Sequence, residues 1–310
     1  MNKKTPFLVK MGGKATSTPA GAMTFLMDYL KKPRDRQLVL VLSAFGKGTN
    51  ALEYIYNYFC GIEDSGYLLS KDFKGDTRRY FEEYASVLLK DQYLPFFDKL
   101  FDEVDRVCNK LAMEPLTDYE RNKFKSELLA YGEIISVALV SEHLQREGIK
   151  HAVVPAYEYV HTDSNFCNAE VDFASTSSAL SSVMHNFTDA AKWPIIITHG
   201  FIGRDRVGNI TNLGRDGSDL TAVLVAQAYG LREVTLCKDV KGVYYPNSER
   251  NDKPIALLSY NEAREYIVNE TGTLIFPRSL DFAEKNRISI KIAHYNTPEQ
   301  VGTTITHVAL

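Results

Sequence analysis

The sequence has few cysteines and no excess of either charge, and each shortage excludes a class of protein. Only four cysteines stand among 310 residues and none forms a C-x-x-C pair, so neither a zinc site nor a dithiol redox motif is expected. Lys and Arg total 36 against 39 Asp and Glu, a formal net charge of -3. This balance argues against binding nucleic acid or an anionic membrane through bulk charge. We expect free thiols in a reducing, cytoplasmic compartment.

Long apolar runs are also missing. The longest, near residues 38–42 and 194–197, are far shorter than the roughly 20 residues that cross a bilayer. The basic start of the chain is typical of a signal peptide, but Lys10 and the pair Gly12-Gly13 interrupt the apolar stretch that would have to follow. Apolar residues make up 45% and charged residues 24%, which is typical of a soluble globular chain.

The two commonest nucleotide-binding fingerprints do not occur. Gly46-Lys47-Gly48-Thr49 looks like the end of a Walker A loop, but Val41 stands where the leading glycine is required. No G-x-G-x-x-G, G-x-S-x-G, H-E-x-x-H or EF-hand loop is present either. What remains is a set of glycine-rich turns of another kind.

Strand and helix patterns alternate at both ends of the chain. Strands are predicted at residues 7–10, 37–43, 151–154, 194–198, 233–236 and 288–292, and helices at 18–32, 177–186, 218–229, 261–269 and 277–286. Residues 50–148 are predicted to be helical, with breaks near 61–66, Gly75 and Pro115. This alternation predicts an α/β fold, a three-layer α/β/α sandwich around a mostly parallel sheet.

The last helix of the long helical stretch has clear ends. Thr117 and Glu120 form a capping box, and Gly148 occupies the position typical of a helix C′ glycine. Apolar residues cover this helix on nearly all sides, and Glu133 lies within one of its apolar stripes. A buried carboxylate is costly unless it is paired. Glu133 therefore needs either an internal Lys or Arg or a cationic group of a ligand.

Glycine-rich turns follow three predicted strands, at residues 12–13, 46–49 and 200–203. Ligands of open α/β sheets bind beyond the carboxyl ends of the strands. Glycines there let backbone N–H groups approach phosphate oxygens. One such turn can be an ordinary tight connection, but three in phase favour an anionic ligand.

Charged residues beside these turns suit the same ligand. Lys10 ends the first strand, where its ammonium could lie against phosphates or extend into solvent at the sheet edge. Arg215 offers a bidentate grip on a carboxylate or phosphate. Asp219, in the first turn of a predicted helix, could belong to the site or only interact with the helix dipole. The residues alone leave these alternatives open.

A series of motifs spans the chain in fixed order and spacing. They are Lys10-Met11-Gly12-Gly13, residues 43–50, Tyr131-Gly132-Glu133, Thr162-Asp163-x-x-Phe166, residues 200–203, 213–219 and 238–244, Ser259-Tyr260-x-Glu262-Ala263 and Gly302-Thr303-x-Ile305. Together they resemble the catalytic domain of aspartate kinases, in the amino acid kinase superfamily, from about residue 7 to 306. The long helical stretch before Glu133 is more similar to aspartate kinases than to the shorter acetylglutamate or uridylate kinases.

The resemblance implies a single catalytic domain over residues 1–310, with an amino-acid lobe at 1–193 and a nucleotide lobe at 194–310. It implies transfer of the γ-phosphoryl group of ATP, with Mg²⁺, to the β-carboxylate of L-aspartate, a step in lysine, threonine and methionine biosynthesis. A homodimer is a further expectation. No nucleic acid or membrane partner is expected.

The resemblance also implies roles for individual residues. Lys10 and Asp219 would be catalytic: Lys10 would contact the transferring phosphoryl group, and Asp219 would orient Lys10. The substrate-binding residues would be Ser43, Thr49, Glu133, Arg215 and Ser218, with Glu133 facing the α-amino group and Arg215 a carboxylate. The nucleotide-binding residues would be Gly12, Gly13, Lys238, Asp239 and Tyr244. No residue is assigned to the metal.

Several positions depart from the family pattern. Lys14-Ala15 replaces Thr-Ser after the glycines, which adds a cation near the phosphates, and Asp216 replaces a glycine. Further departures are His161 for Arg, Cys167 for Gly, a missing lysine in residues 272–277 and a lost D-P-R after Tyr244. These changes leave two alternatives: a related kinase with a glutamate, N-acetylglutamate or carbamate acceptor, or a catalytically idle member that only binds ligand.

Family members usually continue into ACT regulatory domains beyond the position of Ile305. None is expected in this chain, which implies either trimming or the lack of built-in feedback by lysine or threonine.

Overall fold

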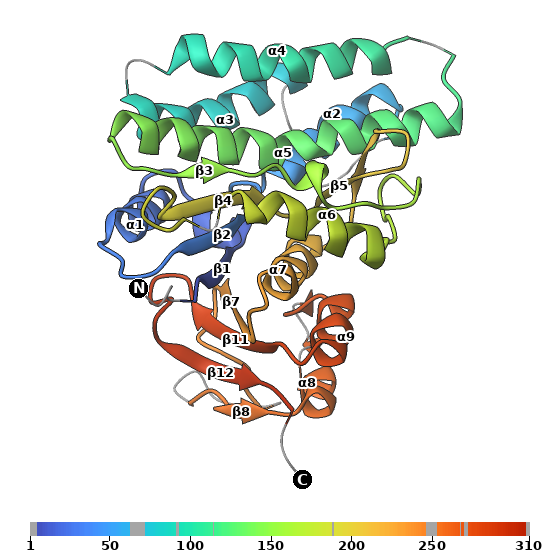
Figure 1. The fold of residues 1–310 in the computed structure, drawn as a ribbon. Coiled ribbons are helices and arrows are strands. Elements are labelled where there is room, and N and C mark those ends of the chain that lie inside the picture. Colours follow the sequence, from blue (N-terminus) through green and yellow to red (C-terminus); the bar gives the residue numbers. More distant parts are fainter. Residues whose placement is uncertain are drawn as a thin grey trace.

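The computed structural model describes residues 5–62, 72–90, 93–113, 115–187, 189–245, 253–266, 268–269 and 272–307. In them one sheet runs in the order β3 (Ala152–Val153), β4 (Ile195–His199), β2 (Leu38–Leu42), β1 (Phe7–Met11), β7 (Glu233–Lys238), β11 (Ser289–His294), β12 (Val301–Ile305) and β8 (Leu257–Leu258) (Figure 1). Neighbouring strands are parallel except for β11 and β12.

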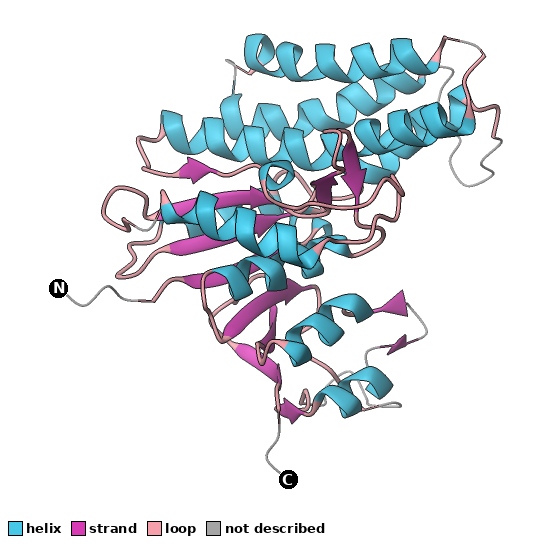
Figure 2. Cartoon of the chain, turned by 45° about the vertical axis from the view of Figure 1, so that its right-hand side comes forward, coloured by secondary structure: helices cyan, strands magenta, loops and turns pink. Residues whose placement is uncertain are grey.

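Helices cover both faces of the sheet (Figure 2). One face carries α1 (Gly21–Lys31), α2 (Gly48–Phe59), α3 (Phe73–Leu89), α4 (Leu94–Leu111) and α5 (Asp118–Arg146). The other carries α6 (Phe173–His185), α7 (Gly217–Ala228), α8 (Tyr260–Tyr266) and α9 (Pro277–Lys285). The predicted three-layer α/β/α sandwich with a mostly parallel sheet is confirmed. None of the described helices is both long and apolar enough to cross a membrane.

Alternation along β1 divides the core between the two faces. Val9 and Met11 pack among the residues of α1 to α5, whereas Leu8 packs on the side of α7. Successive side chains of a strand point to opposite faces, so Lys10 shares its face with Leu8 and α7. The sequence period therefore directs the ammonium of Lys10 towards one particular helix.

Helix α5 lies between the sheet and the outer helices (Figure 1). Its predicted capping box is present, since the Thr117 side chain accepts from the Glu120 N–H and the Glu120 carboxylate accepts from the Thr117 N–H. Past its end, Gly148 has a φ of 69°, the left-handed conformation expected of a C′ glycine. Buried side chains occur on all sides of α5, as its sequence predicted.

Some predicted boundaries are wrong. Gly75 does not break a helix: it lies in the first turn of α3, where its N–H donates to the N-cap carboxylate of Asp72. The break that does occur after α3 falls at Lys90, which has a positive φ of 55°. The helix predicted to end at Asn269 stops at Tyr266, because residues 268–269 pair as a strand with residues 272–273. Here pairing with a neighbouring segment overrode the helical pattern.

Short strands were missed altogether. They are β5 (Ile202–Arg204) and β6 (Ile210–Asn212), which form an antiparallel pair, β9 (Val268–Asn269) and β10 (Gly272–Thr273), β8, and β12. Most are two or three residues long, too short for an alternating pattern to be recognised. The division of the chain at residue 193 stays a prediction; the first strand after it, β4, pairs with β2 and β3.

Candidate active site

Two lysines and one aspartate meet at the carboxyl ends of β1 and β7. In the parallel register Lys10 is opposite Leu236, so Lys238, two residues further along β7, points to the same face as Lys10. Asp219 lies on that face in the first turn of α7 and is fully buried. Its two carboxylate oxygens lie 3.0 Å from Lys10 Nζ and 2.8 Å from Lys238 Nζ. We call Lys10, Asp219 and Lys238 the lysine–aspartate centre.

The electrostatics of this centre favour an anionic ligand. Burial alone would raise the pKa of Asp219, but the ammoniums of Lys10 and Lys238 outweigh it and hold that pKa at about 2. Burial lowers the pKa of Lys238, and Asp219 opposes that shift. The backbone N–H of Phe276, just before α9, also donates to Asp219 at 3.3 Å. Two ammoniums on one carboxylate leave one positive charge at the end of the strands.

The first glycine turn packs closely around this centre. A Cβ atom at Gly12 would lie 3.1 Å from Lys10 Nζ, so the ammonium of Lys10 lies directly against this residue. A side chain at Gly13 would come within 2.3 Å of the Gly46 carbonyl oxygen, which excludes any larger residue. The glycines thus bring the turn after β1 against the turn after β2.

That second turn carries the predicted substrate residues of the amino-terminal half. Ser43 donates its backbone N–H to Met11 at 3.1 Å, and Thr49 lies in the first turn of α2. A side chain at Gly132 would contact Thr49 Oγ1 at 3.2 Å, so α5 approaches α2 as closely as backbone allows. The structure therefore brings Ser43, Thr49 and neighbouring Glu133 to one place.

Glu133 is a buried carboxylate with one oxygen unpartnered. Its exposed fraction is 3%; Oε1 accepts from the Ala44 N–H at 3.1 Å, while Oε2 has no hydrogen-bond partner. In the described part of the chain no lysine or arginine forms an ion pair with it. Burial raises the pKa of Glu133 to about 8, although the Ala44 N–H and the Lys10 ammonium lower it. The sequence left two possible partners for Glu133, an internal Lys or Arg and a cationic group of a ligand. An internal ion pair is not found among the described residues.

The loop before α7 holds the other predicted substrate residues. Ser218 is buried against Gly200, where an added side chain would come within 2.4 Å of the serine Oγ. Arg215 is exposed, and no contact joins it to the lysine–aspartate centre among the residues described. Asp216, the N-cap of α7, has a left-handed φ of 58° that few L residues adopt. The turn at residues 200–203 thus packs against the start of α7.

The predicted nucleotide residues after β7 divide into two groups. Asp239 lies next to Lys238 and accepts from Lys14 Nζ at 2.9 Å. Tyr244 is half-buried, and in the described residues no contact joins it to the lysine–aspartate centre. The lost D-P-R segment after Tyr244 falls at residues 246–248, outside the described residues.

Sequence reasoning missed two tyrosines of α3 that tie the turns together. The Tyr84 hydroxyl donates to the Thr16 carbonyl at 2.8 Å, and the Tyr80 hydroxyl donates to the Phe45 carbonyl at 3.0 Å. A Cβ atom at Gly46 would lie 2.4 Å from the Tyr80 hydroxyl oxygen and 2.6 Å from the Tyr84 hydroxyl oxygen, so both hydroxyls pack against this glycine. Their spacing of four residues places them on one helix face, but nothing in the sequence indicates which loop they contact.

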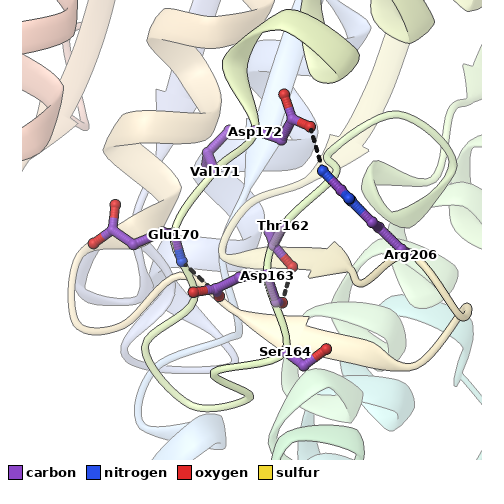
Figure 3. Close-up of a pocket in the computed structure, with 7 residues that line it drawn as sticks. All are labelled: Thr162, Asp163, Ser164, Glu170, Val171, Asp172 and Arg206. Atoms are coloured by element: carbon purple, nitrogen blue, oxygen red, sulfur yellow. Dashed lines mark hydrogen bonds and ion pairs between the residues drawn. The ribbon is translucent and has the colours of Figure 1, made fainter.

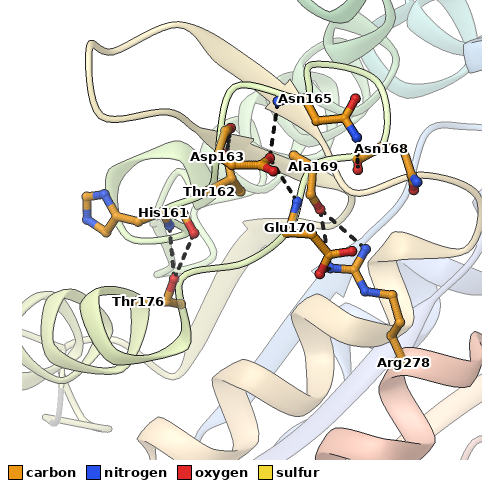
Figure 4. A network of polar contacts seen from close by, with 9 residues as sticks. All are labelled: His161, Thr162, Asp163, Asn165, Asn168, Ala169, Glu170, Thr176 and Arg278. Atoms are coloured by element: carbon orange, nitrogen blue, oxygen red, sulfur yellow. Dashed lines mark hydrogen bonds and ion pairs between the residues drawn. The ribbon is translucent and has the colours of Figure 1, made fainter.

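A shallow polar pocket of about 430 Å³ lies beside the loop that follows His161 (Figure 3). It is lined by Thr162, Asp163, Ser164, Glu170, Val171, Asp172 and Arg206. The Asp163 carboxylate accepts from two backbone N–H groups of its own loop, those of Asn165 and Glu170 (Figure 4). Arg278 of α9 holds the same loop through the Ala169 carbonyl and the Glu170 carboxylate.

Two of the family departures have structural consequences here. His161 is half-buried, and burial together with Arg204 lowers its pKa. Cys167 Sγ donates to the Asn122 carbonyl at 3.7 Å, and burial raises the pKa of its thiol. Neither contacts the lysine–aspartate centre.

Within the described residues the protein side chains alone form no metal centre. Among the described residues no three His, Cys, Asp or Glu side chains lie close enough together to hold a metal ion. Both oxygens of Asp219 already face ammonium groups.

Comparisons with known proteins agree with this fold. The model of the amino acid kinase family matches residues 5–294. Aspartokinase 1, chloroplastic, of Arabidopsis thaliana is 27% identical over 311 residues, which cover 96% of this chain and 52% of that protein. Crystal structures of E. coli aspartokinase III, with lysine and aspartate or with aspartate and ADP, superimpose with TM-scores of 0.81 and 0.80 at 22% identity. They cover 99% and 98% of this chain, and 66% and 65% of those chains.

The three-layer α/β/α sandwich is thus the fold of a known class of α/β proteins. This chain belongs to the amino acid kinase family. Curated aspartokinases are among its relatives, and the chain spans about half of the length of those from Arabidopsis thaliana.

Proposed function

We propose that the chain transfers the γ-phosphoryl group of ATP to the β-carboxylate of L-aspartate. The observation that carries this proposal is the pair of lysines on one buried Asp219, close to the unpartnered carboxylate oxygen of Glu133. The first group suits a phosphate, and the second suits an ammonium. Aspartokinase relatives, and the aspartate and ADP bound to E. coli aspartokinase III, support the same assignment.

The chemistry needs charge neutralisation more than proton transfer. A carboxylic acid with a pKa near 4 is already ionised at pH 7, so no general base is required. An oxygen of the acceptor carboxylate forms a bond to the γ-phosphorus while the bond to the β,γ-bridging oxygen breaks, and ADP leaves. Lys10 and Lys238 would offset the repulsion between the two anions, with Gly12 and Gly13 leaving room for phosphate.

Asp219 would act as a positioning residue in this reaction. Its buried carboxylate fixes both ammoniums within 3.0 Å, so that neither lysine must be reoriented when substrates bind. Magnesium would accompany the ATP phosphates, where it neutralises charge on the nucleotide.

Glu133 favours an acceptor with a free α-amino group. An ammonium at its unpartnered Oε2 would supply the missing cation and make the charged carboxylate stable in its buried position. N-acetylglutamate and carbamate lack that ammonium, so they suit the site less well than aspartate. Ser43, Thr49, Ser218 and Arg215 would complete the amino acid site, and Asp239 and Tyr244 the nucleotide site.

An ADP-release assay with L-aspartate, ATP and Mg²⁺ tests the proposal. We expect aspartate-dependent turnover that falls at least a hundredfold in Lys10→Ala and Asp219→Ala, as is typical when a stabilising group is lost. Glutamate, N-acetylglutamate and carbamate serve as comparison acceptors. Turnover that survives both substitutions, or that prefers another acceptor, would contradict the assignment.

Location and assembly are separate proposals. We propose a cytoplasmic enzyme from the reduced cysteines and ordinary composition, and fractionation of cells expressing the chain tests this. A homodimer is proposed by family similarity, and sedimentation equilibrium tests it.

A further inference from the structure

Lys14 and Asp239 form an ion pair beyond the carboxyl ends of β1 and β7, in the candidate nucleotide site. Met11 and Cys237 are register partners on the parallel strands β1 and β7. Lys14 follows the first of them by three residues and Asp239 follows the second by two, so both extend beyond the same sheet end. Their side chains meet at 2.9 Å, directly beyond the lysine–aspartate centre.

This pair differs in burial from the centre beneath it. The side chains of Lys14 and Asp239 are 76% and 41% exposed, whereas those of Lys10 and Asp219 are 6% and 0% exposed. An exposed ion pair is worth little in water, because both partners are solvated when apart. Breaking a buried pair, in contrast, leaves an uncompensated charge. Lys14 can therefore exchange its partner while Lys10 cannot.

We propose that Lys14 is a third phosphate-contacting lysine of this site, beside Lys10 and Lys238. Asp239 holds the ammonium of Lys14 until a phosphate group of the nucleotide replaces the Asp239 carboxylate as its partner. This rests on the proposed function for the identity of the ligand. The flexible stem of Lys14 allows the ammonium to turn from Asp239 to a phosphate oxygen. Asp239 thus contributes to the nucleotide site through Lys14, whose ammonium it holds before the phosphate arrives.

The charges around the site support this exchange. Asp216 and Asp239 add two carboxylates near the lysine–aspartate centre, and Asp216 acts on Lys238. A triphosphate approaching these carboxylates is repelled unless another cation offsets them. Lys14 supplies that cation from the same turn in which Gly12 lies against the ammonium of Lys10.

Calorimetric binding of Mg·ATP and of adenosine to the intact chain tests the proposal. We expect Lys14→Ala to weaken Mg·ATP binding by about tenfold, the loss of one charge-assisted contact, and to leave adenosine binding unchanged. Lys14→Arg should restore most of the affinity. Asp239→Asn should strengthen Mg·ATP binding, and should do so by a larger factor when Lys14 is present than in the Lys14→Ala background.

A matched control is the ion pair between Lys291 and Glu233. It joins β11 to the first residue of β7, at the opposite end of the strand from Lys238. Lys291→Ala should leave Mg·ATP binding unchanged. If Lys14→Ala changes affinity less than threefold, or no more than Lys291→Ala does, the proposal is wrong; weaker binding in Asp239→Asn would also overturn it.

The aspartate-dependent ADP-release assay of the unaltered chain separates this inference from the proposed function. Lys14-dependent Mg·ATP binding without aspartate turnover would leave Lys14 as a phosphate ligand and reject the aspartate kinase assignment. Aspartate turnover with an unchanged KM for ATP in Lys14→Ala would support the aspartate kinase assignment and reject Lys14 as a phosphate ligand. A chain that binds no Mg·ATP would overturn both.

Discussion

Two buried carboxylates beside the site have opposite electrostatic surroundings. Asp219 faces two ammoniums, and its pKa is held at about 2. Glu133 accepts one backbone N–H and has an unpartnered oxygen, and burial raises its pKa to about 8. One carboxylate is therefore ionised before any ligand binds. The other becomes fully charged near neutral pH only when a cation reaches it.

Replacing Glu133 by glutamine should show this difference as a pH dependence of stability. In the folded chain Glu133 keeps its proton up to about pH 8, whereas in the unfolded chain it loses it near its usual value. The folded state thus binds more protons between these values, so this group's contribution to stability falls as pH rises through that window.

We expect Glu133→Gln to match the unaltered chain near pH 5 and to be the more stable at pH 8.5, measured by urea unfolding without ligand. Glu142→Gln, on the same helix but half-exposed and paired with Arg146, is the control and should give no such gain. A Glu133→Gln variant that is less stable at pH 8.5 would contradict the role of burial.

Asp216 should weaken nucleotide binding by its charge. It stands at the start of α7, makes no capping hydrogen bond with its side chain, and acts electrostatically on Lys238. Because asparagine also tolerates the left-handed conformation, Asp216→Asn removes the charge and keeps the backbone. We expect the Kd for Mg·ADP to fall severalfold, as calorimetry would measure. Asp105→Asn, in the outer helix α4, should leave it unchanged, and equal shifts in both variants would contradict the explanation.

At the scale of elements, α3 joins the helical layer to the site. Its residue Tyr84 contacts the turn after β1, and Tyr80 contacts the turn after β2; these turns lie on the two sides of the proposed reaction. In the proposed reaction, the separation between phosphate and acceptor would thus depend on α3, whose tyrosines donate to backbone carbonyls of both turns. The outer helices contribute position as well as a hydrophobic core.

Tyr84→Phe tests this positioning. The loss of one buried hydrogen bond should cost about 1 kcal/mol of stability and raise the KM values for both ATP and aspartate. Tyr260→Phe is matched, since its hydroxyl donates to a backbone carbonyl, that of Ile288, in another part of the chain. That control should lose similar stability with unchanged KM values. If both variants alter only stability, α3 has no positioning role.

At the scale of the whole molecule, one continuous sheet supports the candidate site. Strands β1 and β7 are the middle pair of eight, and the centre between them also involves α7 and the segment before α9. Groups from elements more than 200 residues apart in sequence therefore depend on one core. A ligand at this place contacts both halves of the chain.

Ligand binding should accordingly stabilise the whole fold. With Mg·ADP at about one hundred times its Kd, linkage predicts about 2.7 kcal/mol of added stability, seen as a higher Tm in a single calorimetric transition. Lys10→Ala should lose most of this increase. A ligand-induced rise confined to one of two separate transitions would show instead that the sheet does not unfold as a unit.

Much of the fold follows from local patterns. Residues 38–42 are five consecutive apolar residues, and a strand buried on both faces is the result. Thr117 and Glu120 mark the start of α5 correctly because a capping box uses only residues three apart. In contrast, residues 268–269 were placed in a helix, since their strand partner lies outside any local pattern.

For the site, the sequence by itself determined which groups face which side. Period-two alternation directs Lys10 to the face opposite Val9 and Met11, and the resemblance carried by the motifs implied roles for Asp219, Glu133 and Lys238. Only the tertiary structure decided that both lysines share Asp219, that Glu133 lacks an internal cation, and that Lys14 meets Asp239. Alternation is a property of neighbouring residues. Contacts across 200 residues depend on strand order and register, which the packing of the entire chain selects.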